Sequence, residues 1–157
     1  PLPEAQQDRF LMKVKIEYPT YEEEMEILDL LTGEKEFSDI PINTIVSLQD
    51  LEEIKETIKR VVIDQKLKKY ILDIVFKTRE HSDYIACGAS PRASISLVIA
   101  SKAAAFLDGR DFVMPQDIKK VIYDVLRHRL ILTYEAEAED KKVEDIIDDI
   151  LKTVILP

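Results

Sequence analysis

The sequence predicts a mainly α-helical fold of about five helices, preceded by one extended strand. Apolar residues recur at helical spacing over most of the chain, and helix-capping residues stand before several of these stretches. Strict alternation of apolar and charged residues occurs in residues 12–16. Hydrophobic residues make up 46% of the 157 and charged residues 34%, so we expect one domain with a core of its own and a short appendage.

The expected strand covers residues 10–17. Met12, Val14 and Ile16 alternate with lysines, and Pro19 follows as a residue that cannot donate to a β-ladder. A lone strand is unstable in water, so this one needs a partner. The first candidate is a second copy of the chain, which would give a strand-mediated dimer.

Two other outcomes are open for this strand. It could pair within the chain with one of two short extended runs, residues 61–63 or 130–133. It could also remain an extended arm without a partner.

Capping residues delimit the expected helices. Thr20 and Ser47 are N-caps followed by acidic residues, and Ser90 caps a helix that has Pro91 in its first turn. The expected helices cover residues 20–33, 47–58, 64–79, 90–107, 115–127 and 143–154. The inward residues of the third are Leu67, Ile71, Leu72, Val75 and Phe76. Residues 80–89 read as a loop.

Composition excludes several functions. The net charge is −9, which argues against a nucleic-acid partner. With three glycines, the chain contains neither GxxxxGK[ST] nor GxGxxG. No apolar stretch is long enough to cross a membrane and no secretory leader is visible, so we expect a cytoplasmic protein without a membrane partner.

Few residues could carry chemistry. Two histidines are too few for a histidine-rich metal site, and one cysteine cannot form a cysteine-based zinc site. We expect Cys87 to be an inert, packed thiol. Arg92 is the second residue of the helix that Ser90 caps, and helix N-termini attract anions. Arg92 is therefore either a phosphate ligand or an ordinary surface or salt-bridged arginine. Arg9, next to Asp8, is unremarkable on its own.

Four segments carry a resemblance to a known family. They are residues 2–13 (LPEAQQDRFLMK), 88–94 (GASPRAS), 107–113 followed by 115–118 (LDGRDFV and PQDI), and 125–133 (VLRHRLILT). In this order they resemble the C-terminal region of the MoxR family of AAA+ ATPases. The resemblance covers essentially the whole chain, and residues 88–94 are similar to that family's sensor 2 motif.

The resemblance implies a helical AAA+ lid. Residues 1–19 would be the end of the α/β ATPase core, with its last strand, and residues 20–157 the lid. Arg92 matches the sensor 2 arginine, which reaches the terminal phosphate of ATP. Arg9 matches an arginine finger directed at a neighbouring subunit's nucleotide.

The resemblance further implies an intact protein that uses ATP and Mg²⁺. Its P-loop and Mg²⁺-binding motif would lie upstream, so this chain alone would be inactive and hold no cofactor. The intact protein would form a homo-oligomeric ring, usually a hexamer. It would act as a remodelling chaperone on partners with von Willebrand factor A domains.

Alternatives remain open. The chain could be a free-standing acidic helical interaction module, or the lid of a magnesium-chelatase or Holliday-junction helicase type of ATPase. Its start at Pro1 rather than at methionine suggests a piece of a longer protein. The basic cluster at residues 127–129 either balances the helix dipole and pairs with acidic residues, or contacts the ATPase core or a neighbouring subunit.

Overall fold

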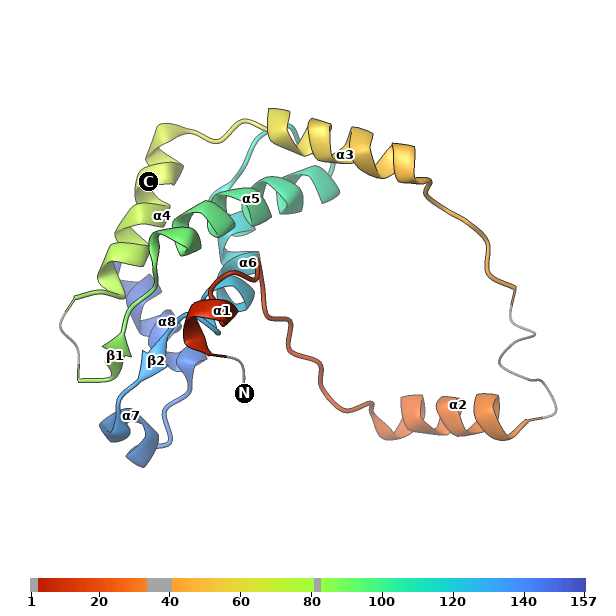
Figure 1. The fold of residues 1–157 in the computed structure, drawn as a ribbon, viewed down its shortest axis with the longest axis horizontal. Coiled ribbons are helices and arrows are strands. Elements are labelled where there is room, and N and C mark those ends of the chain that lie inside the picture. Colours follow the sequence, from red (N-terminus) through yellow and green to blue (C-terminus); the bar gives the residue numbers. More distant parts are fainter. Residues whose placement is uncertain (1–2, 34–40, 81–82) are drawn as a thin grey trace. The chain divides into compact units, whose positions relative to one another are not determined.

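The computed structural model describes residues 3–33, 41–80 and 83–157 and confirms the mainly α-helical fold (Figure 1). Two compact units are present: residues up to 14 together with 55–157, and residues 15–54. In the described ranges the helices are α1 (Glu4–Gln7), α2 (Tyr21–Thr32), α3 (Leu48–Arg60), α4 (Gln65–Lys77), α5 (Pro91–Leu107), α6 (Pro115–Leu126), α7 (Tyr134–Ala138) and α8 (Val143–Thr153). Six of these have eleven or more residues and correspond to the six expected ranges, one helix more than the predicted total of about five.

The helix starts in the smaller unit follow the predicted caps. Thr20 accepts a hydrogen bond from the backbone N–H of Glu23 at 3.3 Å, and its own N–H donates to the Glu23 carboxylate at 2.7 Å. Ser47 and Asp50 exchange the same pair of bonds at the start of α3, at 3.1 and 2.8 Å. Each pair satisfies backbone groups that a helix start leaves without partners.

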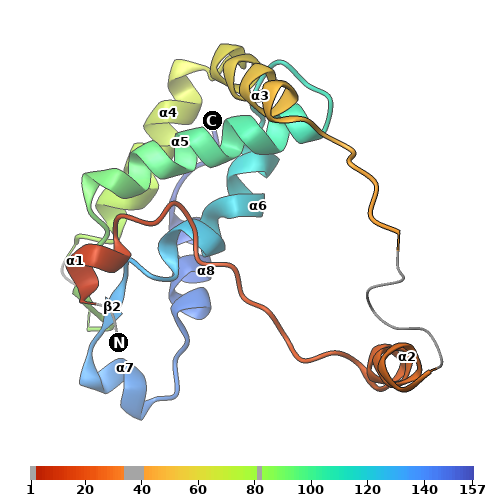
Figure 2. The same cartoon turned by 45° about the vertical axis from the view of Figure 1, so that its right-hand side comes forward.

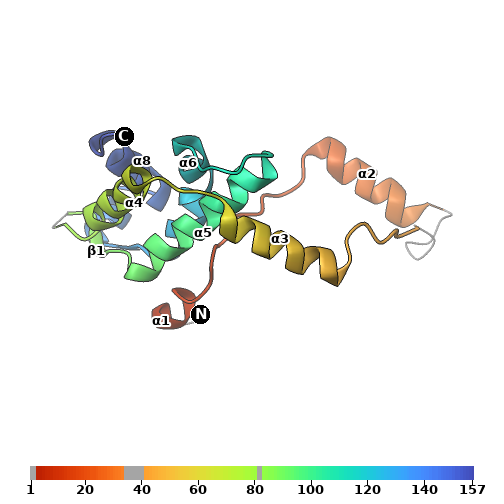
Figure 3. The ribbon, with the colours of Figure 1, turned by 90° about the horizontal axis from the view of Figure 1, so that it is seen from above.

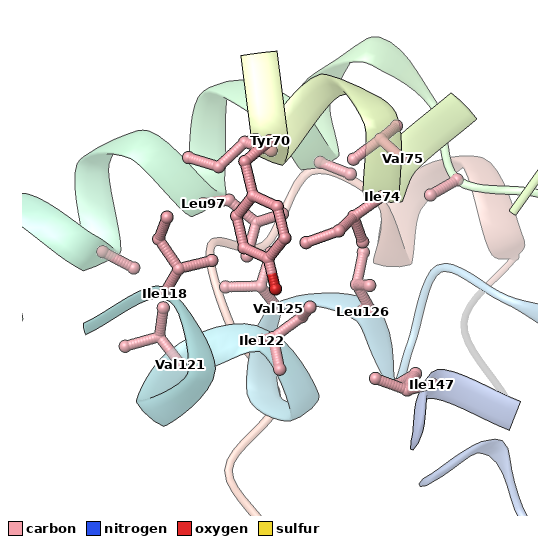
Figure 4. Close-up of a cluster of buried hydrophobic side chains, with 14 of the residues drawn as sticks. Tyr70, Ile74, Val75, Leu97, Ile118, Val121, Ile122, Val125, Leu126 and Ile147 are labelled. Atoms are coloured by element: carbon pink, nitrogen blue, oxygen red, sulfur yellow. The ribbon is translucent and has the colours of Figure 1, made fainter. Parts of the chain in front are cut away.

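The core of the larger unit lies between four helices. α5 packs against α4 and α6, and α8 contacts α4 and α6 (Figure 3). Side chains from all four meet in Figure 4, where Tyr70 of α4 points toward α6 and Ile147 comes from α8. The largest fully buried apolar side chains are Tyr70, Ile71, Ile74, Leu97, Ile118, Ile122, Leu126 and Ile147.

The predicted inward face of α4 is only partly correct. Leu67, Ile71 and Val75 are buried, but Leu72 is 45% and Phe76 58% exposed. Tyr70 and Ile74 are buried instead. The buried residues 67, 70, 71, 74 and 75 follow the i, i+3, i+4 spacing of one helix face, and residues 72 and 76 lie off that face. The tyrosine ring extends into the core as an apolar body with one polar atom.

Two short strands form the only sheet in the described residues. β1 (Ile85–Cys87) pairs antiparallel with β2 (Ile131–Leu132). The prediction of a loop over 80–89 was therefore wrong at β1, a segment too short to show a period. Cys87, expected to be packed, is exposed. Elsewhere, Val62 forms an isolated parallel bridge with Phe112.

The predicted strand over residues 10–17 does not form within this chain, and its pairing with a second copy stays a prediction. Residues 12–20 have no regular secondary structure, and Val14 and Ile16 are 67% and 90% exposed. Pairing within the chain is also excluded, because 61–63 and 130–133 bond to other segments. An extended segment with no strand alongside has no ladder to join, so alternation alone does not produce a strand.

Candidate functional site

The start of α5 is held by the end of α4. The Thr78 hydroxyl accepts a hydrogen bond from the Ala89 N–H at 3.0 Å, and Nε of Arg79 donates to the Ala89 carbonyl at 2.7 Å. Thr78 itself is fully buried. These bonds fix the backbone immediately before Ser90, the N-cap of α5.

Gly88 is required by the close approach of two backbones at this point. A Cβ on residue 88 would lie 2.3 Å from the carbonyl oxygen of Thr78, which is far inside van der Waals contact. We expect Gly88→Ala to lower the free energy of unfolding by about 2 kcal/mol, since the segments must move apart. Gly109→Ala is the control, because residue 109 has open space and only a positive φ of 75°, worth about 1 kcal/mol. Urea unfolding measures both, and equal losses would contradict this explanation.

Arg92 lies in the first turn of α5, as predicted. Its N–H donates to the Ser90 hydroxyl at 3.1 Å. Its side chain is 56% exposed, and Nη1 lies 3.5 Å from Oδ2 of Asp8, too far for a strong hydrogen bond. The guanidinium therefore remains available at a helix end that favours anions.

Asp8 links the N-terminal segment to this helix start. Its carboxylate accepts hydrogen bonds from the Ser90 hydroxyl at 3.0 and 2.8 Å and from Nε of Arg129 at 3.1 Å. We call Asp8, Ser90, Arg92 and Arg129 the Asp8 cluster. Figure 2 shows α1, which ends just before Asp8, near the start of α5 and beside β2.

Arg129 is the buried member of the Asp8 cluster. Its side chain is 1% exposed. The guanidinium donates to the carbonyl oxygens of Asp8 at 3.2 Å, Phe10 at 2.6 Å and Leu11 at 3.2 Å. It also donates to the Ser96 hydroxyl at 3.1 Å and to the carbonyl of Val125. One arginine thus binds residues 8–11 to α5 and α6.

The neighbouring residues of the basic cluster extend this contact. Arg127 donates to the carbonyl of Lys13 at 2.7 Å and forms ion pairs with Asp124 at 2.8 Å and Glu144 at 2.6 Å. Nε2 of His128 lies 3.2 Å from the Phe10 carbonyl. The predicted pairing with acidic residues is confirmed, and the cluster also binds residues 8–13.

Burial and charge act against each other on the titratable groups of this region. Burial alone would raise the pKa of Asp8, but hydrogen bonds from Ser90 and Arg129 and the Arg129 charge hold it below its usual value. Burial lowers the pKa of Arg129, and Asp8 opposes that effect. Burial also lowers the pKa of His128, with a smaller contribution from the Arg129 charge, against the bond to Phe10.

His128 makes stability depend on pH. Its pKa in the folded chain lies below the ordinary value of 6.5, so between the two values the unfolded state binds more protons. The contribution of His128 is complete above 6.5 and is lost as the pH falls through the folded pKa. The charges that face His128 are those of Arg129, Lys13 and Asp8.

The matching experiment is urea unfolding of the chain from about pH 7.5 to 5. We expect the free energy of unfolding to fall over this range, and to fall less in His128→Gln, whose amide can still donate to the Phe10 carbonyl. His81 is present in both proteins and cancels in the comparison. Identical pH profiles would contradict the inference.

Arg9 is exposed and lies between two residues whose carbonyl oxygens bind Arg129. In the described part of the chain it has no ion-pair partner. Arg9 directly follows Asp8 in sequence and Arg92 contacts the Asp8 carboxylate, so the structure brings the two arginines near one aspartate, although 82 residues lie between them. Sequence reasoning missed the role of Asp8 and the burial of Arg129; the acidic residue directly before Arg9 was the available signal.

A cavity of about 240 Å³ opens beside the Asp8 cluster. It is lined by Glu4, Ala5, Asp8, Cys87, Gly88, Ser90, His128, Arg129 and Ile131. Among the described residues, no group of three or more His, Cys, Asp or Glu side chains is arranged to hold a metal ion. None of the helices in those ranges is long and apolar enough to span a membrane.

Comparison with known proteins shows which proteins this chain is similar to. Residues 77–150 match the AAA lid domain. The chaperone MoxR1 of Mycobacterium tuberculosis is 41% identical over 165 residues, which cover all of this chain and 43% of that protein. The MoxR protein of Paracoccus denitrificans is 29% identical, over 99% of this chain and 51% of that protein.

A solved structure agrees with both matches. The crystal structure of a candidate ATPase from Cytophaga hutchinsonii superposes with a TM-score of 0.87 and 43% sequence identity, over 100% of this chain and 49% of that one. The chain thus spans about half the length of the curated relatives it matches. It matches a C-terminal part of MoxR-like AAA+ proteins and contains a match to the AAA lid domain.

Proposed function

We propose that this chain is the lid half of a MoxR-type ATPase and that Arg92 is its sensor 2 arginine, reaching the terminal phosphate of ATP. One observation supports the proposal. The Arg92 side chain is 56% exposed at the N-terminus of α5, and its ion pair with Asp8 is 3.5 Å long. A buried arginine locked to a carboxylate could not turn to an external phosphate without breaking that pair, whereas Arg92 can.

Arg9 is proposed as the arginine finger, acting on the nucleotide of a neighbouring subunit. Its side chain is exposed, and its backbone is held on both sides by Arg129. A positive charge fixed near a transferring phosphoryl group stabilises the transition state. In this proposal residues 1–19 are the end of the ATPase core and 20–157 the lid.

ATP and Mg²⁺ belong to the intact protein in this proposal. Arg92 and Arg9 suit the phosphate groups, because guanidinium donors pair well with phosphate oxygens. The P-loop and the Mg²⁺-binding acidic residues would come from the half of the protein that this chain does not span. The whole is proposed as a cytoplasmic homo-oligomeric ring, with six subunits, that remodels partners containing von Willebrand factor A domains.

The proposal is tested by comparing two proteins. The full-length protein should hydrolyse ATP in a Mg²⁺-dependent reaction, and the isolated 157-residue chain should show no activity above background at any concentration. Phosphate release measured on both gives the answer. Reproducible Mg²⁺-dependent hydrolysis by the pure chain would overturn the assignment of this chain as the lid half.

A further inference from the structure

We infer that Asp8 is a positioning residue that makes Arg9 and Arg92 parts of one rigid unit. The inference rests on the proposed function of the two arginines. The supporting observation is the Asp8 cluster. The Asp8 carboxylate accepts hydrogen bonds from Ser90, the N-cap of α5, and from the buried Arg129.

The contacts on Asp8 differ in strength. Those to Ser90 and Arg129 lie between 2.8 and 3.1 Å, and the Asp8 side chain is 18% exposed. The contact to Arg92 is 3.5 Å long and more open to water. Charge-assisted bonds shielded from solvent are the stronger ones, so Arg92 can exchange Asp8 for a phosphate while the other bonds remain intact.

Arg129 fixes the backbone on both sides of Arg9. Its guanidinium donates hydrogen bonds to the carbonyl oxygens of Asp8 and Phe10, which directly flank Arg9, and also to that of Leu11. Lys13 adds a backbone bond to the carbonyl of Asp124 at 2.8 Å. The backbone on both sides of Arg9 is thereby bonded to Arg129, in the segment that follows α6.

A movement of the start of α5 must then move Arg9 as well. Ser90 bonds both the first turn of α5 and Asp8, so a shift of Arg92 toward a phosphate is transmitted through Ser90 and Asp8 to the Arg9 backbone. Coupling of this kind requires a contiguous set of packed, satisfied contacts, which the Asp8 cluster provides. The positions of Arg92 and Arg9 are therefore coupled through Ser90 and Asp8.

The test uses Asp8→Asn in the full-length protein, alone and combined with Arg92→Ala. Asparagine keeps the size of the side chain and removes the charge that Arg129 pairs with. Glu4→Gln is the matched control, because Glu4 is an exposed carboxylate one turn earlier that lines the same cavity. The readouts are amide hydrogen exchange of residues 8–13 without nucleotide, and kcat and KM for ATP.

We expect Asp8→Asn to raise amide exchange in residues 8–13 and to lower kcat about five-fold or more, with KM changed less than about two-fold. In the Arg92→Ala background the further loss of kcat should be smaller than in the wild-type background, because one of the two positioned arginines is absent. Glu4→Gln should change neither readout.

Two results would overturn the inference. Unchanged amide exchange in Asp8→Asn would show that Asp8 does not hold the segment. An equal loss of kcat in both backgrounds would assign Asp8 a structural role independent of Arg92. If Arg92→Ala alone leaves turnover unchanged, the proposed function fails instead, and the amide exchange of Asp8→Asn still decides whether residues 8–13 are bound to α5 through this carboxylate.

Discussion

Arg92→Ala in the full-length protein is expected to lower ATP turnover by about ten-fold or more while the fold survives. The side chain is 56% exposed and has one long ion-pair contact, so its removal costs little packing. A charge that stabilises a transferring phosphoryl group, in contrast, contributes several kcal/mol to the rate. The measurement is steady-state phosphate release together with a thermal unfolding scan.

Arg60→Ala is the control for Arg92→Ala. Arg60 is also exposed, but it lies at the C-terminal end of a helix, α3, whereas Arg92 lies at an N-terminal end. Its replacement should leave turnover unchanged. Equal turnover in wild type and Arg92→Ala would rule out a role for Arg92 in phosphate recognition.

Arg129→Met is expected to lower the free energy of unfolding of the chain by about 3 kcal/mol. The change leaves the Asp8 carboxylate without its buried partner and removes the arginine donor from three carbonyl oxygens of residues 8–11. Urea unfolding monitored by circular dichroism measures the loss.

Arg60→Met serves as the matched replacement for Arg129→Met, since an exposed arginine at a helix end should cost less than about 0.5 kcal/mol. If Arg129→Met lowered the free energy of unfolding no more than Arg60→Met does, Arg129 would not stabilise the segment around Asp8. The conclusion that residues 8–11 are bound to the helices through this side chain would then be wrong.

The helices could be predicted because their signals are local. Thr20, Ser47 and Ser90 each bond to a residue less than four positions further along the chain, and in the described structure a helix follows each of them. The strand at 10–17 failed for the opposite reason. A strand depends on a partner segment, and the alternation of Met12, Val14 and Ile16 carries no information about whether one is present.

The candidate site was predictable in part. Arg92 could be placed in a first turn because Ser90-Pro91 is a local start signal. Asp8 and Arg129 are 121 positions apart in sequence, and their contact arises from tertiary packing, which the spacing of apolar residues does not reveal. The basic cluster at 127–129 showed that charge gathers there, but neither its spacing nor its composition distinguishes the buried Arg129 from its partly buried neighbours.

The most direct test of the account is a structure of the full-length protein with a non-hydrolysable ATP analogue. The measured quantity is the distance from the Arg92 guanidinium nitrogens to the oxygens of the terminal phosphate. We expect about 3 Å, with the Asp8 carboxylate still bonded to Ser90 and Arg129. A bound nucleotide with Arg92 directed to solvent or still paired with Asp8 would contradict it.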